Sequence, residues 1–155
     1  PATTVSTNSY RAMFRDCTSL KNMPNLPATS IASGCYAAMF SGCSSLTDTI
    51  DVLPATTLYS ECYSQMFRYC SSITRAPVLP ALTLESTCYS SMFDACRNLN
   101  YVKAMFLTTP GSSYTNSWLY GVSSTGTFVK NSSATWNVSG GSGIPYSWTI
   151  ETATT

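Results

Sequence analysis

Histidine is absent from this chain of 155 residues, and charged residues make up only 10% of it. Without histidine the commonest general base is missing, and neither a Ser-His-Asp triad nor a Cys-His pair can be built. A net charge of +1 gives no strongly basic surface for nucleic acid or an anionic membrane. The sequence therefore predicts a protein that is not an enzyme, uses no cofactor and binds no nucleic acid.

Long apolar runs are also missing. No stretch approaches about 18 consecutive apolar residues, so no helix that spans a membrane is predicted. No charged-then-apolar leader is present either, which excludes nothing because residue 1 already lies inside a repeated motif. Serine and threonine, by contrast, supply roughly 30% of the chain, about twice their ordinary share. A surface solvated by hydroxyl groups is common among secreted bacterial proteins.

A repeated motif organises the rest of the sequence. Cys-Tyr-x-x-Met-Phe-x-x-Cys, followed by an apolar residue, covers 35–46, 62–73 and 88–99, and a copy with Ser9 in place of the first cysteine covers 9–20. The prolines that lead into the copies are 26, 27 and 26 residues apart, at Pro1, Pro27, Pro54 and Pro80. Self-similarity at such a period predicts that neighbouring units stack, with tyrosine, Met-Phe, Leu/Ile and cysteine side chains in columns.

The first half of each unit has helical spacing. Tyr36, Met39, Phe40 and Cys43 fall at i, i+3, i+4 and i+7, which is one face of a helix. Candidate N-caps precede the helices at Ser33, Ser60 and Ser86. Gly42 is expected to end the second helix in a left-handed conformation. The other copies have Asp16, Tyr69 and Ala95 there, so the sequence does not indicate a general rule.

The second half of each unit, such as 46–50 or 73–77, predicts a brief strand that a proline ends. Glycines and all the tryptophans gather after Leu107, where 126–130, 134–138 and 146–150 read as further strands. We expect an α/β solenoid of four repeats (1–26, 27–53, 54–79 and 80–107), each with one short helix and one short strand. A small β-rich C-terminal cap (108–155) is expected to cover its last layer.

The motif resembles the BspA-like class of leucine-rich repeats, found in bacterial cell-surface proteins. The resemblance lies in Met-Phe-x-x-Cys-x-x-Leu/Ile, as in Met39-Phe40…Cys43…Leu46, and departs from the family by its methionine and by the added Cys-Tyr. The phrase at 53–58 resembles a subgroup in gut Bacteroidetes. The resemblance implies a right-handed, horseshoe-like leucine-rich solenoid, display on the cell surface or secretion, and binding of protein or glycan. It carries no catalytic residues.

The cysteines allow two interpretations. An exported protein can form disulfides, but Cys35 and Cys43 would lie roughly 12 Å apart on a continuous helix, beyond disulfide reach. We favour buried, reduced thiols that act as small hydrophobic groups. No metal site is predicted, because histidine and Cys-x-x-Cys are both absent. Asp48 and Asp51 alone fall far short of a calcium loop.

Aromatic and glycosylation patterns have structural alternatives as well. The tyrosines of the motif are candidates for a sugar platform, but their spacing favours the core. Trp118, Trp136 and Trp148 either fill the cap or contact a ligand. Asn131-Ser-Ser and Asn137-Val-Ser match a glycosylation pattern and also read as turns.

Residues that vary between repeats are the candidate binding surface. On the predicted strand side these are Lys21, Asn22, Thr47, Asp48, Thr74, Arg75, Asn100, Tyr101 and Lys103. Repeat arrays bind through such extended faces, although each residue can also be merely solvated. We expect a non-enzymatic adhesion module for host or neighbouring-cell proteins, at the cell surface or outside the cell. The alternative is a carbohydrate-binding or scaffold part of a larger glycan-handling protein.

Overall fold

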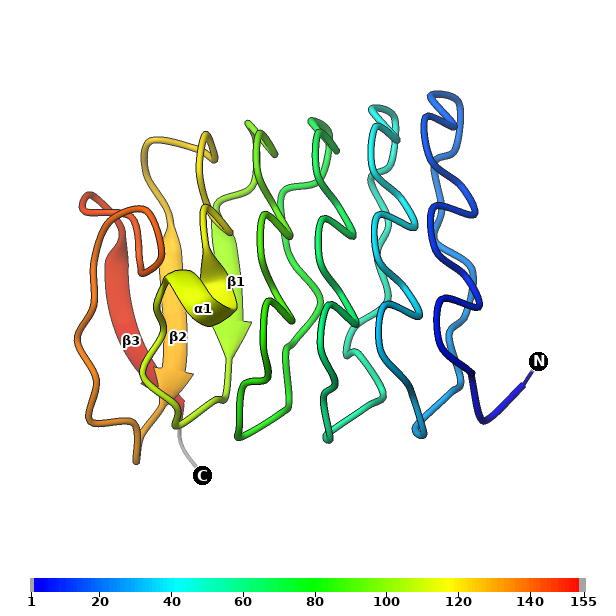
Figure 1. The fold of residues 1–155 in the computed structure, drawn as a ribbon. Helices are drawn as coiled ribbons and strands as arrows, with labels where there is room; N and C mark the ends of the chain where they lie inside the picture. Colours follow the sequence, from blue (N-terminus) through cyan, green and yellow to red (C-terminus); the bar gives the residue numbers. More distant parts are fainter. Residues whose placement is uncertain (1, 154–155) are drawn as a thin grey trace.

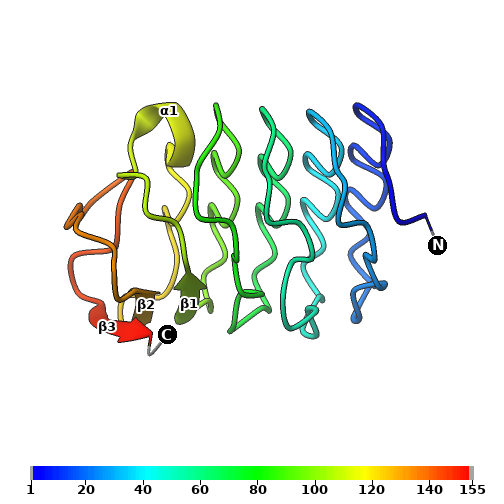
Figure 2. The same ribbon diagram turned by 90° about the horizontal axis from the view of Figure 1, so that it is seen from below.

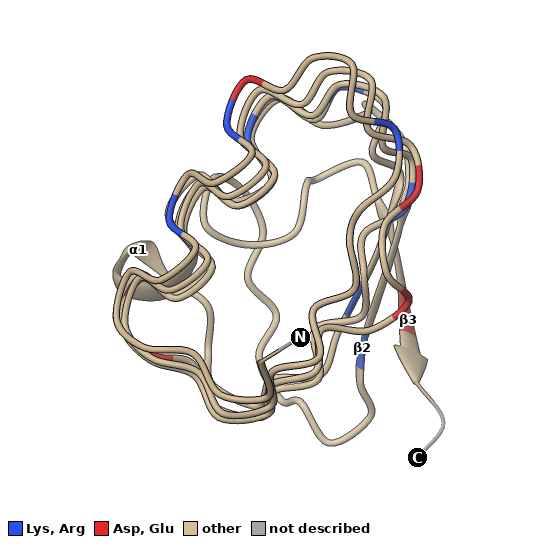
Figure 3. Cartoon of the chain, turned by 90° about the vertical axis from the view of Figure 1, so that its right-hand side faces the viewer, with Lys and Arg blue, Asp and Glu red and all other residues tan. Residues whose placement is uncertain are grey.

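The computed structural model describes residues 2–153. Successive turns of the chain lie one above the next, and seen end-on they superimpose closely (Figures 1 and 3). We call each turn a layer and number the layers 1 to 5, for residues 2–26, 27–53, 54–79, 80–107 and 108–131. Residues 132–153 cover layer 5. Each layer has a turn face, which carries the repeated motif, and a strand face on its opposite side.

Regular secondary structure is scarce within the described residues. The elements are β1 (Tyr101–Ala104), α1 (Ser112–Thr115), β2 (Thr127–Asn131) and β3 (Thr149–Ala153). The three strands form one parallel sheet in the order β1-β2-β3, with Tyr101 opposite Thr127 and Thr127 opposite Thr149. The sheet and α1 lie on opposite sides of the stack (Figure 2).

The prediction of a right-handed α/β solenoid of leucine-rich-type repeats is wrong. Its helices are absent from the motif in residues 2–153, where α1 is the sole helix and has four residues. The predicted strand in each repeat is reduced to isolated bridges, such as Asn22 with Asp48, except at β1. In the C-terminal region, β2 lies where 126–130 predicted a strand, β3 begins later than 146–150 predicted, and 134–138 forms none.

Backbone hydrogen bonding in the motif explains why no helix forms. Odd-numbered residues of 35–43 donate within the layer to the residue three back, as Met39 N–H does to the Tyr36 carbonyl (3.1 Å). Even-numbered residues of 34–42 donate to the next layer, as Phe40 N–H does to the Met66 carbonyl (2.9 Å). In an α-helix every interior N–H would donate to the carbonyl four residues before it in the same segment. Half of these donors instead join the layers.

Left-handed residues recur at every fourth position of the motif. In layer 2 they are Gly34, Ala38 and Gly42, with φ of +62°, +54° and +80°. Layers 1, 3 and 4 put non-glycine residues there, including Asp16 (+59°), Tyr69 (+62°) and Ala95 (+60°). These are the three residues that argued against a rule, so the left-handed position belongs to every copy after all. It is the third residue of a tight turn, the place where type II turns require positive φ.

The core is a set of side-chain columns between the two faces, as the repeat predicted. Tyr10, Tyr36, Tyr63 and Tyr89 stack with ring centroids 5.7, 5.7 and 6.2 Å apart. The phenylalanines of the motif form a second column at 5.6, 5.7 and 5.5 Å. Its last ring, Phe93, belongs to a residue whose N–H donates to the Trp118 carbonyl of layer 5 (2.9 Å). The inter-layer ladder thus continues beyond the fourth motif.

Glycine at a left-handed position is expected to stabilise the protein. Ala38→Gly removes the unfavourable contact of Cβ in this region, worth about 1 kcal/mol, against a smaller entropic cost. Ala32→Gly is the matched control, because Ala32 is also partly exposed and has no positive φ. Urea unfolding should show a gain for Ala38→Gly and a loss of about 0.5–1 kcal/mol for Ala32→Gly. Equal losses at both sites would contradict the turn geometry.

Candidate functional site

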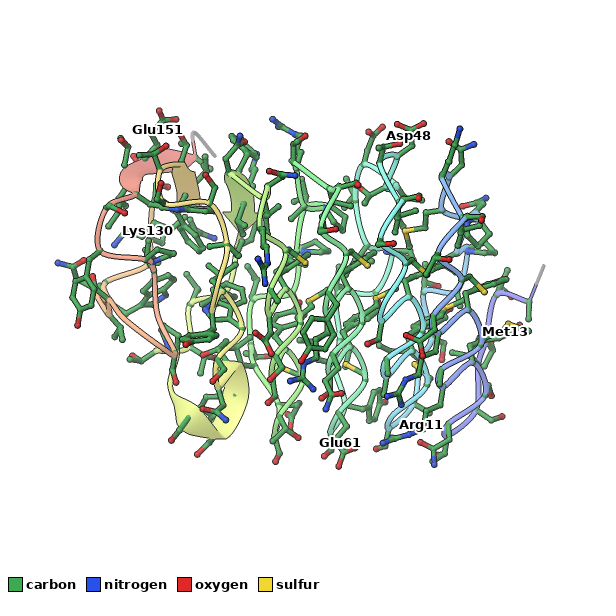
Figure 4. The ribbon with its side chains drawn as sticks, turned by 90° about the horizontal axis from the view of Figure 1, so that it is seen from above. Arg11, Met13, Asp48, Glu61, Lys130 and Glu151 are labelled. Carbon is green, nitrogen blue, oxygen red and sulfur yellow. The ribbon has the colours of Figure 1, made fainter. Side chains whose placement is uncertain are left out.

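The variable residues predicted for binding do lie on the strand face. Backbone hydrogen bonds between neighbouring layers join Thr47 to Lys21 and Asn100 to Thr74, and backbone bridges pair Asn22 with Asp48 and Arg75 with Tyr101. All of these residues, and Lys103 further along β1, are exposed or partly exposed. Figure 4 shows Asp48 and Glu151 on this side of the stack, opposite Arg11 and Glu61 of the turn face. Among these residues, the structure brings the side chains of Arg75 and Tyr101 into direct contact.

Arg75 and Tyr101 form the closest pair. The Arg75 guanidinium carbon lies 3.6 Å from the centroid of the Tyr101 ring, which is a cation–π contact. A backbone bridge holds the two residues in register, with the Ala76 N–H donating to the Tyr101 carbonyl (3.0 Å). Stacking on the ring fixes the guanidinium while its N–H groups still face solvent.

A groove of about 580 Å³ opens beside Arg75, between layers 2 and 3. It contains the predicted residues Thr47, Asp48 and Arg75 and extends over Thr49, Ile50, Asp51, Val52, Ala76 and Val78. The two carboxylates and the guanidinium give its rim both signs of charge. Within residues 2–153 no ion pair joins Asp48 or Asp51 to Arg75.

One extra residue explains the groove. Layer 2 spans 27 residues between its lead-in prolines, against 26 for its neighbours, and the surplus falls between Cys43 and Pro54. In the described chain no backbone hydrogen bond joins residues 48–50 to layer 3, and only the Thr49 hydroxyl reaches the Arg75 carbonyl (3.4 Å). Pairing resumes where Val78 N–H donates to the Asp51 carbonyl (2.8 Å). The extra residue therefore acts as a bulge that opens the strand face. β-Bulges disrupt the pairing of strands locally and are common near functional sites.

Sequence reasoning missed the residues of the bulge itself. Thr49, Ile50 and Val52 were not among the candidates, because 46–50 was assigned to a strand that a proline ends. Asp51 was considered only as a cation ligand together with Asp48. The signal that could have found them is the single 27-residue spacing among spacings of 26.

The cysteines are free thiols, and six of the seven are buried. Cys70 donates to the Phe40 carbonyl of the preceding layer (3.0 Å), and Cys96 does the same to the Phe67 carbonyl (2.9 Å). Burial raises the pKa of the Cys43 thiol to about 11 and that of Cys70 to about 12. A protonated, buried thiol is a poor nucleophile. Cys17, in layer 1, is the exception to the predicted burial, because it is exposed.

The aromatic alternatives are settled by burial. Tyr36, Tyr63 and Tyr89 lie in the core, and the Tyr63 and Tyr89 hydroxyls have no hydrogen-bond partner among the described residues. Trp118, Trp136 and Trp148 are at most 5% exposed. Their indole N–H groups donate to the carbonyls of Gly143, Phe106 and Ser123. None of these rings offers an open face to a sugar.

Glycosylation at Asn131 and metal binding have little geometric support. The Asn131 amide donates to the Met105 carbonyl (3.2 Å) and accepts from Ser133 N–H (2.9 Å), so it holds a turn. Residues 2–153 contain no group of three His, Cys, Asp or Glu side chains placed to hold a metal ion. The described part of the chain also has no helix long and apolar enough to cross a membrane.

Comparison with protein-family models, with curated proteins and with solved structures finds no match in any of the three. The resemblance to the BspA-like class therefore stays a prediction.

Native thiol labelling should modify one cysteine. We expect iodoacetamide at about pH 8 to alkylate Cys17, while the six buried thiols react only after denaturation; mass spectrometry of the digested protein locates the label.

The burial of the other six thiols should also make the stability of the protein depend on pH. Since burial raises the pKa of these thiols above the usual 9.0, the unfolded state loses their protons first as pH rises. The free energy of unfolding should therefore fall between about pH 9 and 12. Rapid native labelling of Cys70 would contradict the packing.

Proposed function

We propose that this protein is a non-enzymatic binding module, displayed at the cell surface or secreted, that recognises proteins of a host or of neighbouring cells through its strand face. The groove between layers 2 and 3 carries this proposal, because residues 48–50 make no backbone hydrogen bond to layer 3 within the described chain. Its lining combines backbone groups without partners in the described chain, apolar side chains and fixed charge.

An extended peptide segment is the ligand that this groove would fit. The backbone groups of Thr49 and Ile50 and the Ala76 carbonyl make no hydrogen bond within residues 2–153. An extended strand can supply the missing donors and acceptors, as peptides do when they add to a sheet edge. Ile50, Val52 and Val78 offer apolar contacts, and the carboxylates and Arg75 select charged side chains at the rim.

The chemistry of the chain favours binding over catalysis. Histidine is absent, and the buried cysteines are protonated. Arg75 on Tyr101 is the type of anchor that dominates interfaces, since arginine and tyrosine are enriched among residues that carry binding energy. The buried tryptophans give the carbohydrate alternative no specific support.

The proposal is tested by a binding screen against purified matrix proteins, arrays of short unstructured peptides, and polysaccharides. We expect Arg75→Glu/Tyr101→Ala to weaken binding of a peptide or protein hit at least tenfold, equivalent to about 1.4 kcal/mol. The matched control is Arg97→Glu/Tyr120→Ala, which changes an exposed arginine and an exposed tyrosine outside the groove.

A deletion of Thr49 provides a second arm, because it restores the 26-residue spacing and should close the groove. We expect this variant to fold, as judged by its thermal unfolding, and to lose the same ligand. Hits that survive both the double substitution and the deletion, or hits confined to polysaccharides, would contradict the proposal.

A further inference from the structure

Two opposite charges in the strand-face groove occupy a position at which other neighbouring layers pair. Four residues hold this position, each as the fifth residue after the cysteine that ends its motif: Asn22, Asp48, Arg75 and Tyr101. Within residues 2–153, backbone bridges join Asn22 to Asp48 and Arg75 to Tyr101, but none joins Asp48 to Arg75. Thr49 lies opposite Arg75 instead, and its hydroxyl donates to the Arg75 carbonyl (3.4 Å). The bulge therefore separates two side chains that a regular register would place as a cross-strand pair.

The charges of the groove are consequently open to a ligand. Asp48, Asp51 and Arg75 are exposed, and the ion pairs within residues 2–153 join other side chains. Asp48, which Figure 4 shows at the surface of the strand face, belongs with Asp51 to layer 2, whereas Arg75 belongs to layer 3. The two walls of the groove thus carry opposite charge. Two carboxylates and one guanidinium give the groove a net charge of −1.

The bottom of the groove determines how an extended segment would lie in it. Ala76 is 4% exposed, and its carbonyl makes no hydrogen bond within residues 2–153, nor do the backbone groups of Thr49 and Ile50. A segment that pairs with these groups directs its own backbone hydrogen bonds toward the bottom of the groove. Successive side chains of a strand point to opposite sides of the plane that contains those bonds. Neighbouring side chains of the segment would therefore point to opposite walls.

We propose that the groove selects an extended segment with the order basic-acidic-basic at three consecutive residues. This inference rests on the function proposed above, since it specifies the peptide that the strand face binds. The acidic side chain pairs with the Arg75 guanidinium, and the two basic side chains point to the other wall and pair with Asp48 and Asp51. The three residues of the segment carry a charge of +1, which neutralises the charge of the groove.

The two walls differ in how strictly they read the segment. The Arg75 guanidinium is held on the Tyr101 ring at 3.6 Å, and a guanidinium in a fixed position can bind a carboxylate through two parallel N–H donors. On the other wall, the basic residues are about 6.8 Å apart along a strand, and flexible lysine stems let them reach two carboxylates three residues apart. The middle, acidic residue therefore has the strictest requirement.

Two capped peptides of equal composition and charge test this order. In Val-Thr-Lys-Glu-Lys-Thr-Val the glutamate points to one wall and both lysines to the other. In Val-Lys-Thr-Glu-Thr-Lys-Val all three charged side chains point to the same wall. We expect the first peptide to bind the intact chain about tenfold more tightly, as measured by chemical-shift titration of isotopically labelled protein.

Reversing the charge of one wall should reverse the preference at the middle residue of the segment. We expect the Arg75→Glu variant to bind a peptide with Lys-Lys-Lys about tenfold more tightly than one with Lys-Glu-Lys, whereas the parent chain prefers Lys-Glu-Lys. The matched control is Arg97→Glu, which changes an exposed arginine outside the groove. This control should keep the preference of the parent chain.

Equal affinity for the two peptides of equal composition, no binding of the first, or an unchanged preference in Arg75→Glu would overturn the proposal. The function of the strand face can fail separately, because deletion of Thr49 should remove every ligand of the groove, whatever its charge order. A hit that is lost on this deletion but ignores the charge order would refute the order alone. A hit that survives the deletion would refute the function of the groove.

Discussion

Inter-layer hydrogen bonding by alternate residues of the motif is the constraint on which the rest of the structure depends. Because every second N–H points along the stack, each layer must present carbonyls at the same spacing as its neighbour, and this keeps the motif at the same position in every layer. The alternation requires a left-handed residue at every fourth position. It also superimposes the side chains, so that tyrosines, phenylalanines and thiols stack in columns. The alternating turn geometry therefore satisfies the backbone hydrogen-bonding groups and packs the core at the same time.

The features that distinguish individual layers arise where this geometry is interrupted. One additional residue in layer 2 removes the pairing at 48–50 and opens a groove on the strand face. At layer 5 the tryptophans end the columns, and their indole N–H groups bond the carbonyls of neighbouring segments. Binding through the strand face is therefore proposed where the repeat is interrupted and not in its regular interior.

Stacking, the side-chain columns and the exposed variable residues could be predicted from the repeat, because they need only the period and the apolar pattern. The local conformation could not. Tyr36, Met39, Phe40 and Cys43 have the spacing of a helix face, but successive tight turns of four residues put the same side chains on one side. Over eight residues, periods of 3.6 and 4 are barely distinguishable. The left-handed positions could not be recognised from the sequence, because several hold non-glycine residues such as Tyr69 and Ala95. Stacking of the layers overrides the preference of these residues for negative φ.

The central claim is that the motif is joined to the next layer by hydrogen bonds and forms no helix. Scalar couplings across hydrogen bonds, measured by NMR on labelled protein, test it most directly. We predict couplings from the Phe40 nitrogen to the Met66 carbonyl carbon and from the Phe67 nitrogen to that of Met92, with Met39 and Met66 coupled to the residues three before them. Couplings to the residue four before, throughout 35–43 and 62–70, would show a helix and contradict the account.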